Sequence, residues 1–301
     1  MTNDRGLMVP SLAVAFSAVL WGVWWMPLRA LEASGLTGDW ASALLFGGAT
    51  LLLLPVALRR RDGFGRAGGA LLFPGLLSGA AFSLWNHALI TGDVVRVSLL
   101  FYLMPIWATA LARLLLQERL RSLRVLSIAL GLVGAAVVLG FEGGVPLPRS
   151  EGEWAGLASG VMFALVATLI RKRGNLGGFE RTFLTFAFAA AVSLLFAVLR
   201  GAGGAPVDAT GPSTMPLLLG CVLWILPTTW LLLWGAGRLD PGWFSILLLL
   251  EIVTAAVSAA LLTSEPFGWR ELAGCVLVLG AGFVEALDQM RAASARGLAS
   301  S

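Results

Sequence analysis

An acidic residue lies in the middle of one of the most apolar stretches of the chain. Pro241 to Leu262 reads PGWFSILLLLEIVTAAVSAALL and is long enough to cross a bilayer, with Glu251 near its centre. A charge at the bilayer centre costs about 2.5 to 3.5 kcal/mol, so such carboxylates usually face a protein interior or a watery cavity and mark a path for ions or ligands. Thr254 and Ser258 follow at helical spacing, which predicts one polar face on this helix.

Aromatic side chains at helical spacing form a second candidate set, since the chain contains 12 tryptophans in 301 residues. Trp21 and Trp25 are four residues apart, as are Trp230 and Trp234, so each pair is predicted to stack on one helix face. These deeper tryptophans can line a pocket, where a desolvated cation over an aromatic ring gains up to about 2 kcal/mol. An interfacial aromatic belt is the simpler explanation for four others at the ends of apolar runs, Trp40, Trp154, Trp243 and Trp269.

Few other side chains could carry chemistry. Asn86 and His87 are adjacent and would point about 100° apart on a helix, so only one is expected to face a cavity. Asn86 is the better candidate for a direct polar contact, and His87 is expected to be a hydrogen-bonded packing residue. With one His and two Cys in the whole chain, the sequence predicts no metal site, no cofactor and no enzymatic activity.

The composition is that of a polytopic membrane protein. Hydrophobic residues make up 58% of the chain and charged residues 13%, against about 25% charged residues in soluble domains. The sequence pI of about 10.0 suggests nucleic-acid binding at first, but the basic residues lie in short clusters between apolar runs. The charge therefore indicates membrane topology, and nucleic acid is not expected as a partner.

Ten apolar runs are long enough to span a membrane at about 20 residues per crossing. They lie near residues 9–31, 39–58, 68–90, 94–116, 122–141, 153–171, 179–200, 214–236, 241–262 and 270–288. With both termini in the cytoplasm, every basic residue falls on the cytoplasmic side except Arg29, Arg96, Arg149, Arg200 and Arg270. This strong positive-inside bias predicts a multi-pass protein of the bacterial inner membrane with both termini cytoplasmic.

The two halves of the chain resemble each other. Residues 147 positions apart match at Asp93 and Asp240 and again at Glu118 and Glu265. Each half holds five runs, an odd number, so the second copy enters the membrane upside down. We therefore predict an all-α membrane protein of ten transmembrane helices, built as two inverted five-helix repeats at residues 1–150 and 151–301. Inverted repeats are typical of alternating-access carriers, which bind substrate near the midplane between the copies.

Two segments carry a family resemblance. The segment HALITGDVVRVSLLFYLMPIWATALARLLLQERL resembles the fourth-helix signature of the drug/metabolite transporter superfamily, EamA type, with its central Pro and terminal Glu-Arg-Leu. The segment LLLLEIVTAAVSAALLTSEPF resembles the second copy, although Ile252 replaces the proline that often follows the mid-helix Glu. The resemblance implies a ten-helix carrier whose cavity is lined by helices 1, 3, 4, 6, 8 and 9, similar to the YddG-like amino-acid exporters.

These observations predict a solute carrier whose partners are a small-molecule substrate and membrane lipid. We expect export of small zwitterionic metabolites such as amino acids; the alternative is uptake of a quaternary amine such as choline through an aromatic pocket. Glu251 would either couple transport to protons or pair with a substrate ammonium, unless it is only structural. The predicted substrate site combines six residues that face a common volume if spans 1, 3, 4, 8 and 9 converge: Trp21, Trp25, Asn86, Tyr102, Trp230 and Glu251.

Prolines inside four of these spans predict interruptions of regular helix. Pro27, Pro74, Pro105 and Pro227 each remove a backbone hydrogen bond and are expected to kink their helices. Carbonyls freed beside Pro105 and Pro227 could bind substrate amines or act as hinges. The GxxxG pair Gly75 and Gly79 is predicted to be a close-packing contact between helices.

Overall fold

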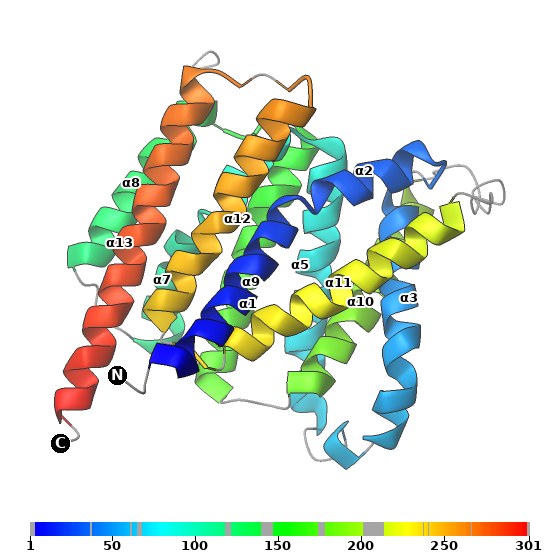
Figure 1. The fold of residues 1–301 in the computed structure, drawn as a ribbon, viewed down its shortest axis with the longest axis horizontal. Coiled ribbons are helices and arrows are strands. Elements are labelled where there is room, and N and C mark those ends of the chain that lie inside the picture. Colours follow the sequence, from blue (N-terminus) through cyan, green and yellow to red (C-terminus); the bar gives the residue numbers. More distant parts are fainter. Residues whose placement is uncertain are drawn as a thin grey trace. The chain divides into compact units, whose positions relative to one another are not determined.

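The computed structural model describes residues 4–36, 38–60, 62–64, 68–117, 122–139, 147–173, 178–200, 214–236, 238–239, 241–265 and 267–299. Every regular element among these residues is a helix (Figure 1). In chain order they are α1 (Asp4–Gly22), α2 (Trp25–Ala33), α3 (Asp39–Arg59), η1 (Gly68–Leu71), α5 (Leu72–Thr91), α6 (Val94–Phe101), α7 (Met104–Leu116), α8 (Ser122–Leu139), α9 (Glu151–Arg173), α10 (Gly178–Leu199), α11 (Thr214–Ala236), α12 (Pro241–Leu262) and α13 (Trp269–Ala299).

Helices occupy all ten predicted spans, which confirms the all-α membrane fold. Six segments are long and apolar enough to cross a membrane by length and composition: Met8–Ala33, Asp39–Arg59, Val94–Leu115, Glu151–Leu169, Gly178–Leu199 and Thr214–Leu232. Shorter apolar helices cover Ser122–Val138 and Ile246–Leu262. Three of the four tryptophans assigned to an interfacial belt, Trp154, Trp243 and Trp269, are exposed, as lipid-facing side chains should be.

Two of the predicted spans are each divided into two helices. The first span is split between α1 and α2, and the fourth is split between α6 and α7. Pro27 lies in the first turn of α2 and Pro105 in the first turn of α7, where a missing N–H costs no helical hydrogen bond. The expected kinks at Pro27 and Pro105 are thus breaks between two helices. Pro74 also lies in a first turn, that of α5, whereas Pro227 lies inside the continuous helix α11.

The described helices form two compact units, and each unit takes helices from both halves of the sequence. Unit 1 contains α1, α6, α7, α8, α12, α13 and the part of α11 from Pro227 onward. Unit 2 contains α2, α3, α5, α9, α10 and the part of α11 up to Leu226. The domains proposed for residues 1–150 and 151–301 are repeats of the sequence, whereas these units describe how the helices pack.

Helices that correspond in the two repeats pack against each other. In unit 1, α8 lies along α13 and α6 contacts α12, which joins span 5 to span 10 and span 4 to span 9 (Figure 1). In unit 2, α3 packs along α10, which joins span 2 to span 7. Pairing of equivalent helices is what an approximate twofold relation between inverted repeats produces. The start of α1 and the end of α13 lie at the same end of unit 1 (Figure 1).

Small residues and hydroxyl groups bring the helices of unit 2 close together. A Cβ atom at Gly79 would lie 2.6 Å from the Ala189 amide nitrogen, so α5 and α10 meet backbone to backbone there. The Ser83 hydroxyl lies 2.9 Å from the Ala189 carbonyl oxygen and accepts a hydrogen bond from the Ser193 hydroxyl at 2.9 Å. The predicted close-packing role of Gly75 and Gly79 is therefore confirmed, since α10 also packs on Gly75.

Two carboxylates close the amino end of α6 in unit 1. The Glu265 carboxylate accepts a hydrogen bond from the Val94 amide at 2.8 Å, and Asp93 accepts one from the Arg96 amide at 3.0 Å. Burial raises the pKa of the Asp93 carboxyl, the hydrogen bond from Arg96 opposes this shift, and the nearby Glu265 charge adds to it. Glu265 thus caps a helix, a structural role, while its predicted counterpart Glu118 lies outside the described residues.

Cysteine labelling tests the inverted ten-span topology. In a background without the two native cysteines, single cysteines at Leu147 and Ser264 should react with a membrane-impermeant maleimide added outside intact cells. Single cysteines at Asp62 and Arg238 should react only after the membrane is opened. All four side chains are exposed, so burial does not mask them. External labelling of Asp62 or Arg238 would contradict the predicted number of crossings.

Candidate functional site

Glu251 lies in α12 of unit 1, opposite the last turn of α1. A Cβ atom at Gly22 would lie 2.6 Å from the Thr254 Cβ and 2.7 Å from the Glu251 carbonyl oxygen. Only a glycine lets α1 approach α12 this closely, because any other side chain would meet the α12 backbone. Gly22 therefore fixes the distance between the end of α1 and the turn that carries Glu251.

Tyr102 lies at the break between α6 and α7 and is hydrogen-bonded through its phenol to the Glu251 carboxylate. The α6 helix also packs against α12 in unit 1. The structure therefore brings two of the predicted site residues into direct contact, at a point where regular helix stops. A phenol is a neutral donor, so this contact shields the carboxylate without neutralising its charge.

Thr254 and Ser258, the other members of the predicted polar face of α12, bond to the backbone of the same helix. The Thr254 hydroxyl donates to the Leu250 carbonyl at 2.7 Å, and the Ser258 hydroxyl donates to the Ala255 carbonyl at 3.1 Å. Hydroxyl groups in membrane helices commonly bond back to their own helix in this way. Glu251, in contrast, bonds to a side chain outside α12, that of Tyr102.

Trp21 packs edge to face against Trp24, with ring centroids 5.8 Å apart and planes at 60°. Both belong to unit 1, and Trp21 is 8% exposed. The predicted stacking of Trp21 on Trp25 assumed one continuous helix, whereas Trp21 lies in α1 and Trp25 begins α2, so this pairing stays a prediction. Trp21 precedes Gly22 and so lies beside the contact between α1 and the Glu251 turn of α12.

The second predicted tryptophan pair is confirmed. Trp230 stacks on Trp234 with centroids 6.1 Å apart and planes at 27°, both in the part of α11 that belongs to unit 1. The Arg238 guanidinium lies 4.2 Å from the Trp234 ring centroid, so a cation–π contact follows the two stacked rings. Trp230 is 60% exposed among the residues that the structure describes.

The remaining two predicted site residues, Trp25 and Asn86, belong to unit 2. Trp25 is buried in α2, and the Arg29 guanidinium lies 5.4 Å from its ring centroid. Arg29 also donates to the Leu89 and Gly92 carbonyls at 3.1 and 2.7 Å, and so binds the carboxyl end of α5. Asn86 is fully buried in α5.

The six predicted site residues thus fall into two sets. Unit 1 contains Tyr102 and Glu251 in direct contact, Trp21 beside the Gly22 contact, and the exposed Trp230. Unit 2 contains Trp25 and Asn86. Their convergence on one substrate stays a prediction.

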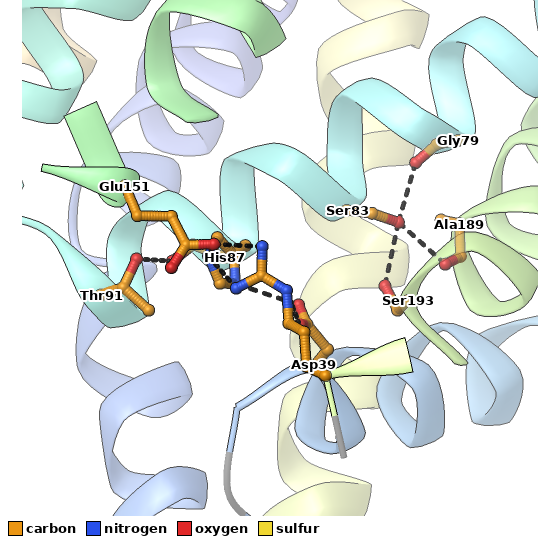
Figure 2. Close-up of polar contacts among 9 residues, drawn as sticks. Asp39, Gly79, Ser83, His87, Thr91, Glu151, Ala189 and Ser193 are labelled. Atoms are coloured by element: carbon orange, nitrogen blue, oxygen red, sulfur yellow. Dashed lines mark hydrogen bonds and ion pairs between the residues drawn. The ribbon is translucent and has the colours of Figure 1, made fainter. Parts of the chain in front are cut away.

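A cluster of charged side chains around His87 was not predicted from the sequence. The Nδ1 atom of His87 lies 3.2 Å from Asp39 Oδ1, and Nε2 lies 3.1 Å from Arg200 Nη1 and 3.4 Å from Glu151 Oε1 (Figure 2). Arg200 also pairs with Glu151 through Nη2 and lies 3.8 Å from Asp39 Oδ2 through Nε. All four residues belong to unit 2.

Topology was the signal that could have revealed this cluster. Asp39 and Glu151 are the first residues of α3 and α9, Arg200 follows the last residue of α10, and His87 lies near the end of α5. In the predicted topology all four positions are external. His87 is hydrogen-bonded as expected for a packing residue, but its partners are ionisable groups rather than backbone.

Comparison with known proteins identifies relatives of the whole chain. The sequence profile of the EamA-like transporter family matches twice, over residues 9–140 and 150–284. No curated protein matches the sequence significantly. A crystal structure with 21% sequence identity aligns over 94% of this chain and 97% of its own, with a TM-score of 0.56, and supports the fold alone.

Substitution of Gly22 tests how the Glu251 turn is positioned. Gly22→Ala should lower the free energy of unfolding by about 1 to 3 kcal/mol, because the new methyl group would overlap α12. Gly47→Ala in α3 is the matched control: among the described residues, no atom beyond its own stretch of helix lies within 4 Å of the place that its new methyl group would take, so stability should change by about 1 kcal/mol or less. Thermal unfolding in detergent measures both, and equal stabilities would contradict the close contact.

Proposed function

Since the chain belongs to the EamA-like transporter family and is therefore a membrane transporter of small solutes, we propose that it exports small zwitterionic metabolites such as amino acids. Transport would proceed by alternating access, as inverted repeats allow. The proposed location is the bacterial inner membrane with both termini in the cytoplasm, supported by the distribution of Lys and Arg.

The observation that carries the proposal is the contact between Tyr102 and Glu251 at the helix break. An intramembrane carboxylate is costly unless it has a partner, and the phenol supplies one in this structure. A substrate ammonium is a stronger partner than a phenol, because both members of that hydrogen bond are charged. Substrate binding would then displace Tyr102 from Glu251. The conformation of the break between α6 and α7 would therefore depend on whether substrate is bound.

The ends of α6 and α7 complement a zwitterion. The carboxyl end of α6 bears a partial negative charge and the amino end of α7 a partial positive charge, and the two ends are separated only by Tyr102 and Leu103. Pro105 has no amide hydrogen to offer the Phe101 carbonyl four residues earlier. Broken helices of this type bind the charged groups of substrates in other carriers. The ammonium would lie toward Glu251 and the carboxylate toward α7.

Uptake of a quaternary amine such as choline is the second candidate, and the tryptophans favour it. Trp21 and Trp24 lie beside the Gly22 contact with α12, and the ring of Trp230 is exposed. Aromatic faces together with a carboxylate suit a methylated ammonium. A quaternary amine lacks N–H groups and cannot hydrogen-bond to Glu251, so the two candidates differ in how strongly they need an accepting carboxylate. A panel of radiolabelled amino acids and amines in proteoliposomes separates them.

Isosteric changes at the pair test the proposal. For a bound amino acid, Glu251→Gln should weaken affinity by roughly 10- to 100-fold at every pH, because a charged hydrogen bond is worth about 1.5 to 3 kcal/mol. If Glu251 carries a coupling proton instead, the same variant should lose gradient-driven accumulation and pH dependence but retain exchange. Tyr102→Phe should leave the carboxylate without its phenol partner and change affinity in either case. Binding and counterflow assays in proteoliposomes measure these effects.

The matched control lies one turn further along α12. Thr254→Val keeps the shape of a side chain whose hydroxyl bonds to its own helix, so affinity and pH profile should match those of the parent protein. Glu251→Gln with unchanged affinity, accumulation and pH profile would show that Glu251 is a structural carboxylate. The proposed substrate role would then be wrong.

A further inference from the structure

We propose that His87 is a proton-binding site at one end of unit 2, where protonation exchanges Arg200 for Glu151 as the partner of Nε2. The site is separate from the Tyr102–Glu251 pair, which belongs to unit 1. The proposed proton site therefore does not depend on which solute the protein carries. The ligand is the proton itself, and its binding switches the cluster between two hydrogen-bond arrangements.

The cluster joins the ends of four helices. His87 lies one turn before the end of α5, Asp39 begins α3, Glu151 begins α9, and Arg200 follows the last residue of α10 (Figure 2). A change in the partners of His87 therefore changes which helix ends are tied together. Among these contacts, Arg200 is the one that ties the end of α10 to α5.

The contact with Arg200 defines one protonation state. A guanidinium has hydrogen-bond donors and no acceptor, so at 3.1 Å the Nε2 atom of His87 must accept from Arg200 Nη1. An accepting Nε2 carries no proton, so the ring is neutral and its one N–H is on Nδ1. That N–H then donates to Asp39 Oδ1 at 3.2 Å. The geometry thus specifies the neutral Nδ1–H tautomer.

Glu151 is placed to accept a hydrogen bond from His87 when the ring is protonated. Glu151 Oε1 lies 3.4 Å from the same Nε2 atom, slightly beyond the Arg200 nitrogen. When water delivers a proton to Nε2, that atom becomes a donor and can no longer accept from Arg200. The new N–H would donate to Glu151, while Nδ1–H keeps its bond to Asp39. Arg200 would leave the ring, and the end of α10 would lose its bond to His87 while the packing of α10 on α5 around Ser83 remains.

The surroundings of the ring supply both rigidity and access. The side chains of His87 and Asp39 are 4% and 3% exposed, so their contact is shielded from water. The side chains of Arg200 and Glu151 are 42% and 59% exposed, so the partners that exchange reach solvent. An imidazole is the side chain that ordinarily exchanges its proton between about pH 5 and 8.

Two acidic side chains and one basic side chain lie around the ring of His87: Asp39, Glu151 and Arg200. Further charged residues on the helices that pack against α5 include Arg29 and Glu153. Arg29 of α2 binds the Leu89 and Gly92 carbonyls, and Glu153 of α9 donates its backbone amide to the Ser150 hydroxyl at the start of its own helix.

His87 is the only histidine in the chain, so one labelled imidazole reports the site directly. The full-length protein, made with ¹⁵N-histidine, purified through a tag without histidine and placed in nanodiscs, is titrated by NMR. At alkaline pH the shifts should show the neutral Nδ1–H tautomer. Acidification should convert it to the imidazolium. A neutral ring protonated on Nε2, or a ring that stays neutral down to about pH 5, would overturn the proposal.

Two variants should move the midpoint in opposite directions. Arg200→Gln removes a positive neighbour and should raise it, while Glu151→Gln removes the acceptor of the protonated state and should lower it, each by roughly half a pH unit or more. Arg270→Gln, an arginine of the other unit that lies over the Trp269 ring, is the control and should not move it. Shifts of the same sign, or none, would show that Arg200 and Glu151 do not exchange at Nε2.

Hydrogen exchange measures the release of the end of α10 from His87. After correction for the intrinsic effect of pH, amides in the last turn of α10 should exchange at least several-fold faster below the midpoint than above it. His87→Gln cannot bind the proton and should show the same protection at both pH values. Equal protection of this turn in the parent protein above and below the midpoint would mean that Arg200 stays bound, against the proposal.

Discussion

Lipid offers no hydrogen-bond partners, so backbone N–H and C=O groups inside a membrane must bond to each other. The rest of the structure depends on this constraint. Every span among the described residues meets this need with helix, and the exceptions are two breaks, each followed by a proline in the first turn of the next helix. The break between α6 and α7 bears Tyr102, whose phenol bonds to Glu251. Polar chemistry therefore occurs where regular structure stops, because an interrupted helix is the place where backbone and side-chain groups can be offered to a ligand.

Close packing in this protein comes from small residues and hydroxyl groups. Lipid is as apolar as leucine, so helices in a membrane gain little by burying apolar side chains against each other. Gly22 lets α1 reach the backbone of α12, and Gly79 lets α5 reach that of α10. Serine hydroxyls then donate to carbonyls of neighbouring helices, as Ser17 does to Thr228 and Ser127 to Ala281. Such contacts hold backbones at fixed distances, which a site built from several helices requires.

Composition and charge were enough to predict the fold class, because apolar length and basic loops follow directly from the cost of placing charge in lipid. Pro27 and Pro105 indicated where two spans are interrupted, but not that each of these spans consists of two separate helices, since hydropathy measures burial and not backbone continuity. Tyr102 and Glu251 were each recognisable as unusual residues, but their contact is tertiary. The partners of His87 begin or end separate helices, and no local pattern connects them.

Helix α11 runs from one compact unit into the other without a break. The chain passes from one compact unit to the other at four points, and three of them lie in a break or a connection between helices. The fourth lies within α11, where Leu226 ends one unit and Pro227 begins the other without interruption of the helix. A continuous rod transmits rotation, while a proline in it weakens resistance to bending by one hydrogen bond. Along α11, bending therefore meets least resistance at Pro227.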